Sequence, residues 1–246
     1  MNPLLLRLKD TVKWVLRVLP FAVTQNQRYD RQTEAVIRSV CRRNSNCIDV
    51  GTHRGEILDL MLRVAPEGEH FGFEPLPHFY GGLQEKYKGH DNVHVFPYAL
   101  CAEEGVSSFN WVVSNPAYSG LRKRRYDRPV EEDTRIEVPT RRLDEVVLSY
   151  NAPVQLMKID VEGGEMDVLR GAEGLLRRDH PVIIFEFGIG GSDIYGTTPQ
   201  VLLDFLAPLG YRVSLMGRYL KKQPPFTPAE LDAQFYGQKN FYFIAY

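Results

Sequence analysis

The sequence predicts an α/β domain with a mostly parallel sheet, helices on both faces and an antiparallel last strand. From Arg28 onward, short β-like runs alternate with helical stretches, as in a sheet wrapped by helices. A glycine-containing turn over 49–55 follows the first run and opens a helix. Residues 182–187 are almost continuously apolar, as a strand buried on both faces requires. The chain of 246 residues suffices for one such domain, which we place at 28–246.

The elements of the first half follow from hydrophobic periodicity. They are helix 33–42, strand 46–50, helix 55–64, strand 70–74, helix 79–88 and strand 93–97. Residues 107–113 predict an extra strand outside the alternation, with 136–139 as its partner. The polar segment 114–133 between them is too long for a simple connection and is a candidate active-site loop.

In the second half the alternation resumes. Its predicted elements are strand 156–160, helix 165–178, strand 182–187, helix 199–209 and strands 211–216 and 240–246. Pro199 and Gly210 mark the two ends of the helix over 199–209. Because the Pro-rich segment before the last strand shows no crossover helix, we expect that strand to be antiparallel.

Residues 1–27 form a separate N-terminal extension with an amphipathic pattern. Residues 1–20 are leucine-rich, but charges interrupt them before any apolar run reaches signal-peptide or transmembrane length. On a helix the apolar residues share one stripe. The stripe fits packing on the domain or on a partner in a homodimer, and it also fits peripheral contact with the inner face of a membrane.

The overall composition is that of a globular protein, with 43% hydrophobic and 25% charged residues. A formal net charge of −1 predicts no nucleic-acid partner, and the basic run over 122–125 is interpreted as a solvated loop. Cys41, Cys47 and Cys101 lack the spacing of a disulfide framework or zinc site, which fits a reducing cytoplasm.

The turn Asp49-x-Gly51-x-x-x-Gly55 is the first indication of a binding site. Glycines let the backbone approach a ligand closely, although a tight strand-to-helix turn uses them too. Glu74 ends the next strand, where a carboxylate can accept hydrogen bonds from both ribose hydroxyls of a nucleoside. The turn lacks the middle glycine that admits a pyrophosphate. The charge of Asp49 also favours the cationic end of S-adenosylmethionine over a nicotinamide dinucleotide.

A second cluster of charged residues, Lys158, Asp160, Glu162 and Glu165, follows a later apolar strand. Asp160 and Glu162 are two residues apart, so both can face one cleft if the strand conformation continues. Such acids could act as a general base, anchor an acceptor or bind a divalent metal, and Glu186 is a further candidate for these roles. Structural alternatives are that Glu165 complements a helix dipole and that Glu186 is a buried, paired carboxylate.

With its other motifs, the sequence resembles the FkbM-type methyltransferases over roughly residues 46–246. The motifs are Asp49-Val-Gly-x-x-x-Gly55, Phe73-Glu74-Pro75-x-Pro77, Tyr98-Ala99-Leu100 with Gly105, Thr140-x-x-Leu143-Asp144, Lys158-Ile-Asp160-Val-Glu162-Gly163-x-Glu165 with Val168-Leu169-x-Gly171, and Asn240-Phe241. His53-Arg54 departs from the family, in which an asparagine and a small or apolar residue are more usual. The resemblance implies a class I methyltransferase fold and, most often, O-methylation of a sugar hydroxyl in a glycan, surface polysaccharide or natural product.

Carried over to this chain, the resemblance implies a set of cofactor-binding residues. They are Asp49, Gly51, Thr52, His53, Gly55, Glu74, Pro75, Ala99, Leu100 and Asp160. It also implies that Asp160 faces the reacting centre and that Ser119 lies in a loop near it. Because a sugar hydroxyl is a weak nucleophile, we expect Asp160 or Glu162 to act as base, tuned by Lys158, with Glu186 as a further catalytic residue. A divalent metal at Asp160, Glu162 and Glu186 is left open but not favoured.

The acceptor side is expected at segment 114–127 and loop 188–198, where Ser192, Asp193 and Tyr195 join Ser119 as candidate substrate-binding residues. With a lipid-linked acceptor, the N-terminal helix would keep the protein near its substrate at the membrane. The alternatives are a nucleoside-binding module without catalysis, a methyltransferase for a non-sugar small molecule, a nicotinamide oxidoreductase and a nucleic-acid methyltransferase. Against a nucleic-acid methyltransferase, the sequence contains no Asn-Pro-Pro-Tyr-type tetrapeptide.

Overall fold

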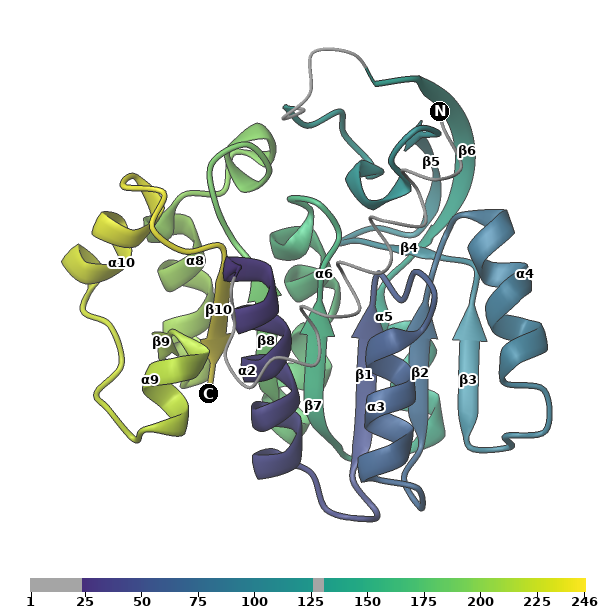
Figure 1. The fold of residues 1–246 in the computed structure, drawn as a ribbon, viewed down its shortest axis with the longest axis horizontal. Helices are drawn as coiled ribbons and strands as arrows, with labels where there is room; N and C mark the ends of the chain where they lie inside the picture. The colour runs from purple at the N-terminus through teal and green to yellow at the C-terminus, as the bar shows by residue number, and fades with distance from the viewer. Residues whose placement is uncertain (1–23, 126–130) are drawn as a thin grey trace.

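The computed structural model describes residues 24–125 and 131–246. Their strands form a seven-stranded sheet in the order β3-β2-β1-β7-β8-β10-β9 and a three-stranded sheet in the order β4-β6-β5 (Figure 1). The predicted amphipathic helix over 1–20 lies outside the described residues. Within the described part of the chain, no helix is both long and apolar enough to cross a membrane.

The large sheet is parallel except at one edge. Its strands are β1 (Asn46–Val50), β2 (His70–Phe73), β3 (Val93–Phe96), β7 (Val154–Ile159), β8 (Val182–Glu186), β9 (Val213–Ser214) and β10 (Tyr242–Ala245). Neighbours from β3 through β8 pair in parallel, whereas β10 runs antiparallel to both β8 and β9. The predicted mostly parallel sheet with an antiparallel last strand is confirmed.

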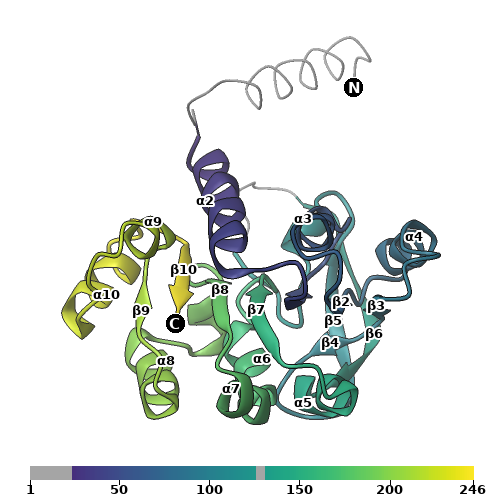
Figure 2. The same cartoon turned by 90° about the horizontal axis from the view of Figure 1, so that it is seen from below.

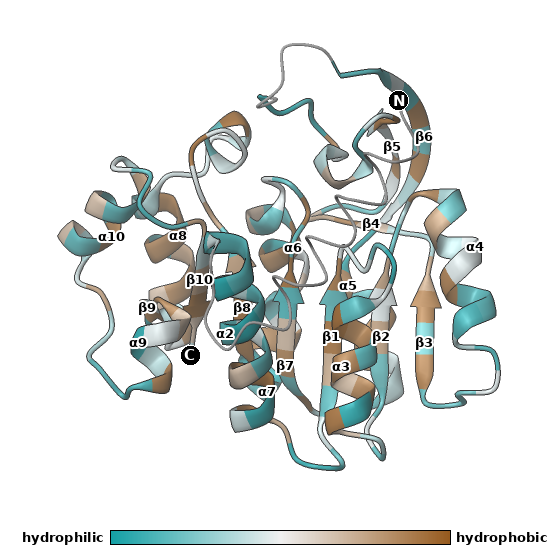
Figure 3. Ribbon diagram, viewed as in Figure 1, coloured by the Kyte–Doolittle hydropathy of each residue, from teal (hydrophilic) through white to brown (hydrophobic). Residues whose placement is uncertain are grey.

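Helices cover both faces of this sheet, also as predicted (Figure 2). One face carries α2 (Gln25–Val40), α3 (Glu56–Val64) and α9 (Met216–Leu220), and the other carries α5 (Leu143–Val147), α6 (Glu165–Gly171), α7 (Glu173–Asp179) and α8 (Pro199–Leu206). Successive residues of β1 serve the two faces, since Cys47 packs with Ile37 and Ile48 packs with Leu169. The strands of the large sheet are mostly hydrophobic and the surrounding loops mostly polar (Figure 3).

The small sheet stands beyond the carboxyl ends of the large one (Figure 1). It contains β4 (Ala99–Leu100), β5 (Gly105–Val112) and β6 (Asp133–Arg141). The predicted pairing of the extra strand is confirmed, with β5 and β6 antiparallel from Gly105↔Thr140 to Val112↔Asp133. Both strands are longer than predicted, and the two-residue β4 was not predicted.

Several helices differ from the prediction for identifiable local reasons. Helix α2 begins at Gln25 instead of residue 33, because the Thr24 side chain caps it and Gln27 completes a capping box. The predicted helix over 165–178 is two helices, α6 and α7, that meet at Gly171. A Cβ at Gly171 would lie 2.2 Å from the Cys101 carbonyl oxygen, so the residue that follows β4 packs directly on this junction.

Three further helices, α5, α9 and α10, lie where no helix was predicted. Helix α10 (Pro228–Phe235) carries a Thr227–Glu230 capping box inside the segment interpreted as a Pro-rich excursion. Helix α9 occupies the end of the predicted strand 211–216, of which only Val213–Ser214 is a strand. Helix α4 (Pro77–Lys86) lies next to β3, at the edge of the large sheet (Figure 1).

Candidate active site

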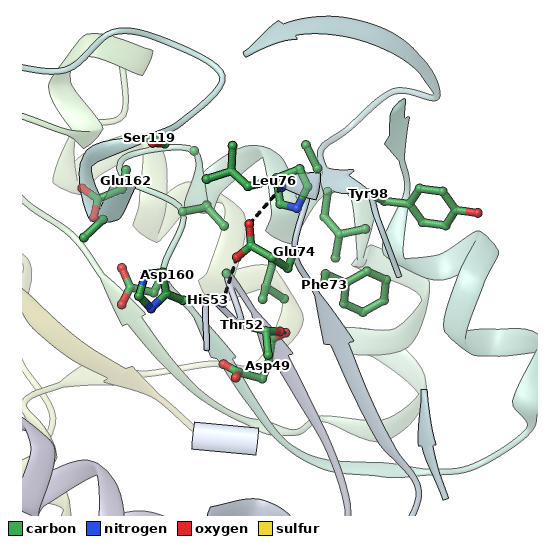
Figure 4. Close-up of a pocket in the computed structure, with 18 of the residues that line it drawn as sticks. Asp49, Thr52, His53, Phe73, Glu74, Leu76, Tyr98, Ser119, Asp160 and Glu162 are labelled. Atoms are coloured by element: carbon green, nitrogen blue, oxygen red, sulfur yellow. Dashed lines mark hydrogen bonds between the residues drawn. The ribbon is translucent and has the colours of Figure 1, made fainter. Parts of the chain in front are cut away.

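A cavity opens at the carboxyl ends of β1, β2 and β7, beside the small sheet. The cavity has a volume of about 260 Å³, close to the lower end of the roughly 300–1,000 Å³ of small-molecule sites. Asp160 and Glu162 lie on one side of it, Phe73 and Tyr98 on the other, and Glu74 between them (Figure 4). The carboxyl ends of parallel strands are where open α/β sheets bind ligands.

The turn after β1 forms part of the cavity wall. Gly51 has φ +81°, in the left-handed region that favours glycine. A Cβ at Gly51 would lie 1.9 Å from the carbonyl oxygen of Asp160, so no larger residue fits there. The Asp160 N–H also donates to the Val50 carbonyl at 3.0 Å. The backbones at the ends of β1 and β7 are therefore in direct contact.

Asp49, in β1, is a carboxyl that is only 1% exposed yet lines the cavity. Its Oδ1 has no hydrogen-bond partner among the described residues. Burial raises the pKa of Asp49 to about 7, against the opposing charge of Lys158. A buried polar atom without a partner is costly. This environment therefore favours a ligand that brings a cation or a hydrogen-bond donor.

Glu74 directly follows β2 and is held by two backbone donors. Its Oε2 accepts from the His53 N–H at 2.8 Å and its Oε1 from the Leu76 N–H at 3.0 Å (Figure 4). Burial raises the pKa of Glu74 to about 7, although these two hydrogen bonds lower it. Each carboxylate oxygen can accept a further hydrogen bond, so the side chain can still receive hydroxyls from a ligand.

Asp160, just beyond β7, forms a close pair with Lys158. The Lys158 Nζ donates to Asp160 Oδ2 at 2.9 Å, and the Tyr242 hydroxyl donates to the same oxygen at 2.6 Å. Burial alone would raise the pKa of Asp160, but Lys158, Tyr242 and a hydrogen bond with Glu186 bring it below the ordinary value. Burial would lower the pKa of Lys158, yet the charges of Asp160 and Asp49 raise it. Asp160 is therefore held as an anion.

Glu162 and Glu186 complete a cluster of acids beside Asp160, with carboxylate oxygens of the three residues within 4.8 Å of one another. Glu162 has φ +60° and forms an ion pair with Arg124, whose side chain is 15% exposed. Burial and then the charge of Asp160 raise the pKa of Glu186 to about 8. The backbone turn at Glu162 thus directs its side chain toward Arg124.

Glu165, in the first turn of α6, fixes the loop between Asp160 and that helix. Its Oε1 accepts from the Val161 and Gly163 N–H groups, both at 3.1 Å. Burial raises the pKa of Glu165 to about 7. The side chain therefore holds the turn that carries Glu162.

Comparison with known families gives a match to the methyltransferase FkbM domain over residues 49–213, more than half of the chain. The chain belongs to the FkbM methyltransferase family. A search of curated proteins found no match.

Among solved structures, this FkbM domain is similar to a methyltransferase FkbM from Methylobacillus flagellatus KT, with 14% identity and a TM-score of 0.52. The similarity covers 84% of this chain and 44% of that one, so the chain spans less than half of that protein's length. It is also similar to a SAM-dependent methyltransferase from Aquifex aeolicus (13% identity, 87% of each chain, TM-score 0.42). A protein of Streptococcus mutans solved in complex with SAH matches at 12% identity, over 88% and 96% of the chains, with a TM-score of 0.47. The predicted class I methyltransferase fold is confirmed by the strand order and the shared FkbM fold.

Most residues predicted for the site of this FkbM domain lie on one cavity. Those that line it are Asp49, Gly51, Thr52, His53, Glu74, Pro75, Ala99, Leu100, Ser119, Lys158, Asp160, Glu162 and Tyr195. Gly55 does not line it but begins α3 with φ +81°, where a Cβ would lie 2.5 Å from the Tyr87 hydroxyl. Its role is in the backbone of the turn.

Three predicted residues of the FkbM domain lie elsewhere. Ser192 Oγ accepts from the Gly188 N–H at 3.1 Å and Asp193 Oδ1 from the Gly190 N–H at 2.6 Å, so both fold loop 188–193 instead of lining the large cavity. Glu186 and Ser192 line a smaller neighbouring cavity together with Arg124. The side chains of Ser192 and Asp193 therefore satisfy the backbone of a glycine-rich loop.

Two side chains that contact the acids, Arg124 and Tyr242, were not predicted from the sequence. Arg124 belongs to the basic run interpreted as a solvated loop, but it lies inward on Glu162 with its guanidinium over the Tyr118 ring at 5.0 Å. Nothing in the run Arg122-Lys123-Arg124-Arg125 distinguishes Arg124 from its neighbours in the sequence. Tyr242 lies in an apolar strand, and nothing in its neighbourhood in the sequence indicated a partner 82 residues away.

Proposed function

We propose that the protein transfers a methyl group from S-adenosylmethionine to a hydroxyl of a sugar in a glycan or natural product. The observation that carries the proposal is a single cavity bounded by two buried acids, Asp49 and Glu74, and by the Lys158–Asp160 pair. Family membership supports the reaction class. The residues of the cavity support the cofactor and the hydroxyl acceptor.

The cavity has the chemistry to hold S-adenosylmethionine at both polar ends. Asp49, with its unpartnered buried Oδ1, suits the cationic methionine portion. Glu74 suits the ribose hydroxyls, because its oxygens keep lone pairs beyond the two backbone bonds. The buried segment Ala99–Leu100 supplies an apolar wall for the adenine, and Gly51 keeps the adjacent backbone free of a side chain.

The bound cofactor supplies an electrophilic methyl group on a sulfonium sulfur. Asp160 suits the role of base, since Lys158 and Tyr242 keep it ionised at the cavity wall. When bound, S-adenosylmethionine would supply the methyl group and keep the C–S bonding pair, and Asp160 would take the proton of the acceptor hydroxyl. Of the two predicted bases, Glu162 suits the role less, because its carboxylate is already paired with Arg124.

A resident metal ion is not part of the proposed reaction. The three acids are close enough to share an ion. However, Lys158 and Arg124 already provide positive charge to two of them, at Asp160 and at Glu162. A divalent cation would have to displace these partners, so the donor set does not fit a resident metal well.

A hydroxyl-rich acceptor is supported by polar groups that line the cavity. Ser119 and Tyr195 are two of them, and Tyr195 accepts from the Arg122 N–H at 2.8 Å through its hydroxyl oxygen. An acceptor of another class, such as a phenolic natural product, would need the same base, and a module that only binds the nucleoside would need neither Asp160 nor Lys158.

The test uses the full chain with S-adenosylmethionine labelled in its methyl group. A panel of sugar nucleotides, oligosaccharides and phenols is offered as acceptors, and calorimetry measures S-adenosylhomocysteine binding separately. Transfer to a sugar supports the proposal, and transfer to a phenol alone would replace the acceptor class. Tight binding without transfer to any acceptor would favour the binding module, and absence of binding would contradict the cofactor.

A further inference from the structure

The last strand brings a tyrosine hydroxyl to the acid that we propose as base. Tyr242, the first residue of β10, donates to Asp160 Oδ2, the oxygen that also accepts from Lys158. Neither of these two bonds falls on Oδ1. Because a carboxylate turns easily about its last torsion, one donor alone would leave either oxygen free to face the cavity. Two donors from different strands fix Oδ2, and a further hydrogen bond joins Asp160 to Glu186.

Tyr242 is itself fixed by helix α2. The Tyr29 ring packs on it with ring centroids 5.1 Å apart. The Tyr29 hydroxyl accepts from the Phe241 N–H at 3.0 Å and donates to Asn240 Oδ1 at 3.3 Å, so the two residues before Tyr242 are tied to the same helix. On the other side Tyr242 pairs with Glu186 of β8. A hydroxyl supported in this way is preorganised to orient its partner.

We propose that Tyr242 is a positioning residue, which holds the Asp160 carboxylate in the orientation that meets the acceptor hydroxyl. The proposal rests on the function proposed above, in which Asp160 accepts the proton. Tyr242 acts on the acceptor only through Asp160, since it does not itself line the large cavity.

The titration of Asp160 reports on this contact. The charged and titratable groups that act on Asp160, respond to it or lie beside it come from several elements: Asp49 on β1, His53 in the following turn, Lys158 on β7, Glu162 before α6 with its partner Arg124, Glu165 on α6, Glu186 on β8 and Tyr242 on β10. Among them Tyr242 and Lys158 both lower the pKa of Asp160 by donating hydrogen bonds. Removing the Tyr242 hydroxyl should therefore raise that pKa.

The experiment compares wild type, Tyr242→Phe and the matched control Tyr246→Phe, which removes a hydroxyl next to the end of the same strand. Carboxyl ¹³C resonances of labelled aspartates are followed against pH, with the Asp160 resonance assigned by its loss in Asp160→Asn. Loss of one charge-assisted bond should raise the Asp160 midpoint by about one pH unit, a tenfold change in proton affinity. Tyr246→Phe should leave the midpoint at the wild-type value.

Two further readouts separate positioning from folding. With any acceptor that wild type methylates, Tyr242→Phe should lower kcat about tenfold or more, leave KM within about twofold and shift the acid limb of the pH profile upward. S-adenosylhomocysteine affinity should be unchanged. A wild-type midpoint in Tyr242→Phe overturns the proposal, and with a lowered Tm it would show that the hydroxyl serves the fold alone. Absence of transfer by wild type would count against the proposed function, while the NMR midpoint would still decide whether Tyr242 acts on Asp160.

Discussion

Replacing Asp49 with asparagine should make the ligand-free protein more stable and the cofactor complex weaker. The native pKa of Asp49 is about 7, against an ordinary value of 3.8. Between these two values the native state binds more protons than the unfolded state, so the folding stability falls as pH rises. An asparagine side chain carries no charge, so Asp49→Asn escapes this penalty, which is fully present in wild type above pH 7.

The size of the effect follows from the same two values. Each pH unit between the two values changes the free energy of unfolding by about 1.4 kcal/mol per group. The stability of Asp49→Asn relative to wild type should therefore grow by up to about 3 kcal/mol between pH 5 and pH 8. For a chain of this size that corresponds to a gain in Tm of several degrees, at about 2–4 °C per kcal/mol. Losing a hydrogen bond to a charged group should weaken S-adenosylmethionine binding by roughly 10–100-fold.

Thermal unfolding of the free protein at both pH values and calorimetry with S-adenosylmethionine measure the two effects. Asp91→Asn is the matched control, because Asp91 is exposed and lies in the turn before β3. If the free energy of unfolding of Asp49→Asn relative to wild type does not increase between pH 5 and pH 8, burial of the Asp49 charge does not destabilise the folded protein. An unchanged cofactor affinity would remove Asp49 from the binding site.

Four other predictions concern the site and the N-terminus. Asp160→Asn should reduce turnover at least 100-fold while S-adenosylhomocysteine binding persists, and full turnover would contradict its role as base. Gly51→Ala should abolish cofactor binding or folding, because its Cβ would meet the Asp160 carbonyl at 1.9 Å; a functional variant would refute that packing. EDTA treatment followed by magnesium or manganese should leave turnover unchanged, since Lys158 and Arg124 already serve the acids, and metal-dependent recovery would show otherwise. Deleting residues 1–20 should lower co-sedimentation with anionic vesicles without changing cofactor affinity, and unchanged co-sedimentation would dispose of membrane contact.

Elements with a strong local pattern could be predicted from the sequence. Strand β1 was predicted with the bounds that the structure has, because its apolar run stops at a glycine turn. The two-residue β4 carries no periodicity and exists only because it pairs with β6. Helix α10 was missed because Pro224 and Pro225 outweighed the Thr227–Glu230 capping box that begins it.

The part of the cavity formed by strand ends was more predictable than the part formed by loops, for a physical reason. Asp49 and Glu74 lie at the ends of adjacent parallel strands, so strand order alone brings them together. The contact between Arg124 and Glu162 depends on the left-handed backbone at Glu162 and on the long loop that carries Arg124. Neither feature produces a hydrophobic periodicity in the sequence. Ser192 and Asp193 were assigned to the acceptor by residue type. In the structure their side chains accept hydrogen bonds from the backbone N–H groups of Gly188 and Gly190.

The contact between Gly51 and the Asp160 carbonyl has a consequence for how acceptor preference can change. It fixes the spacing between the cofactor turn and the base within the sheet, together with the Asp160 N–H bond to Val50. Segments 114–125 and 188–198 do not set that spacing, and they bond to each other through the Arg122 N–H to the Tyr195 hydroxyl and the Arg125 N–H to the Gly190 carbonyl. A graft that exchanges both segments together should therefore alter the acceptor while conserving the affinity for the cofactor.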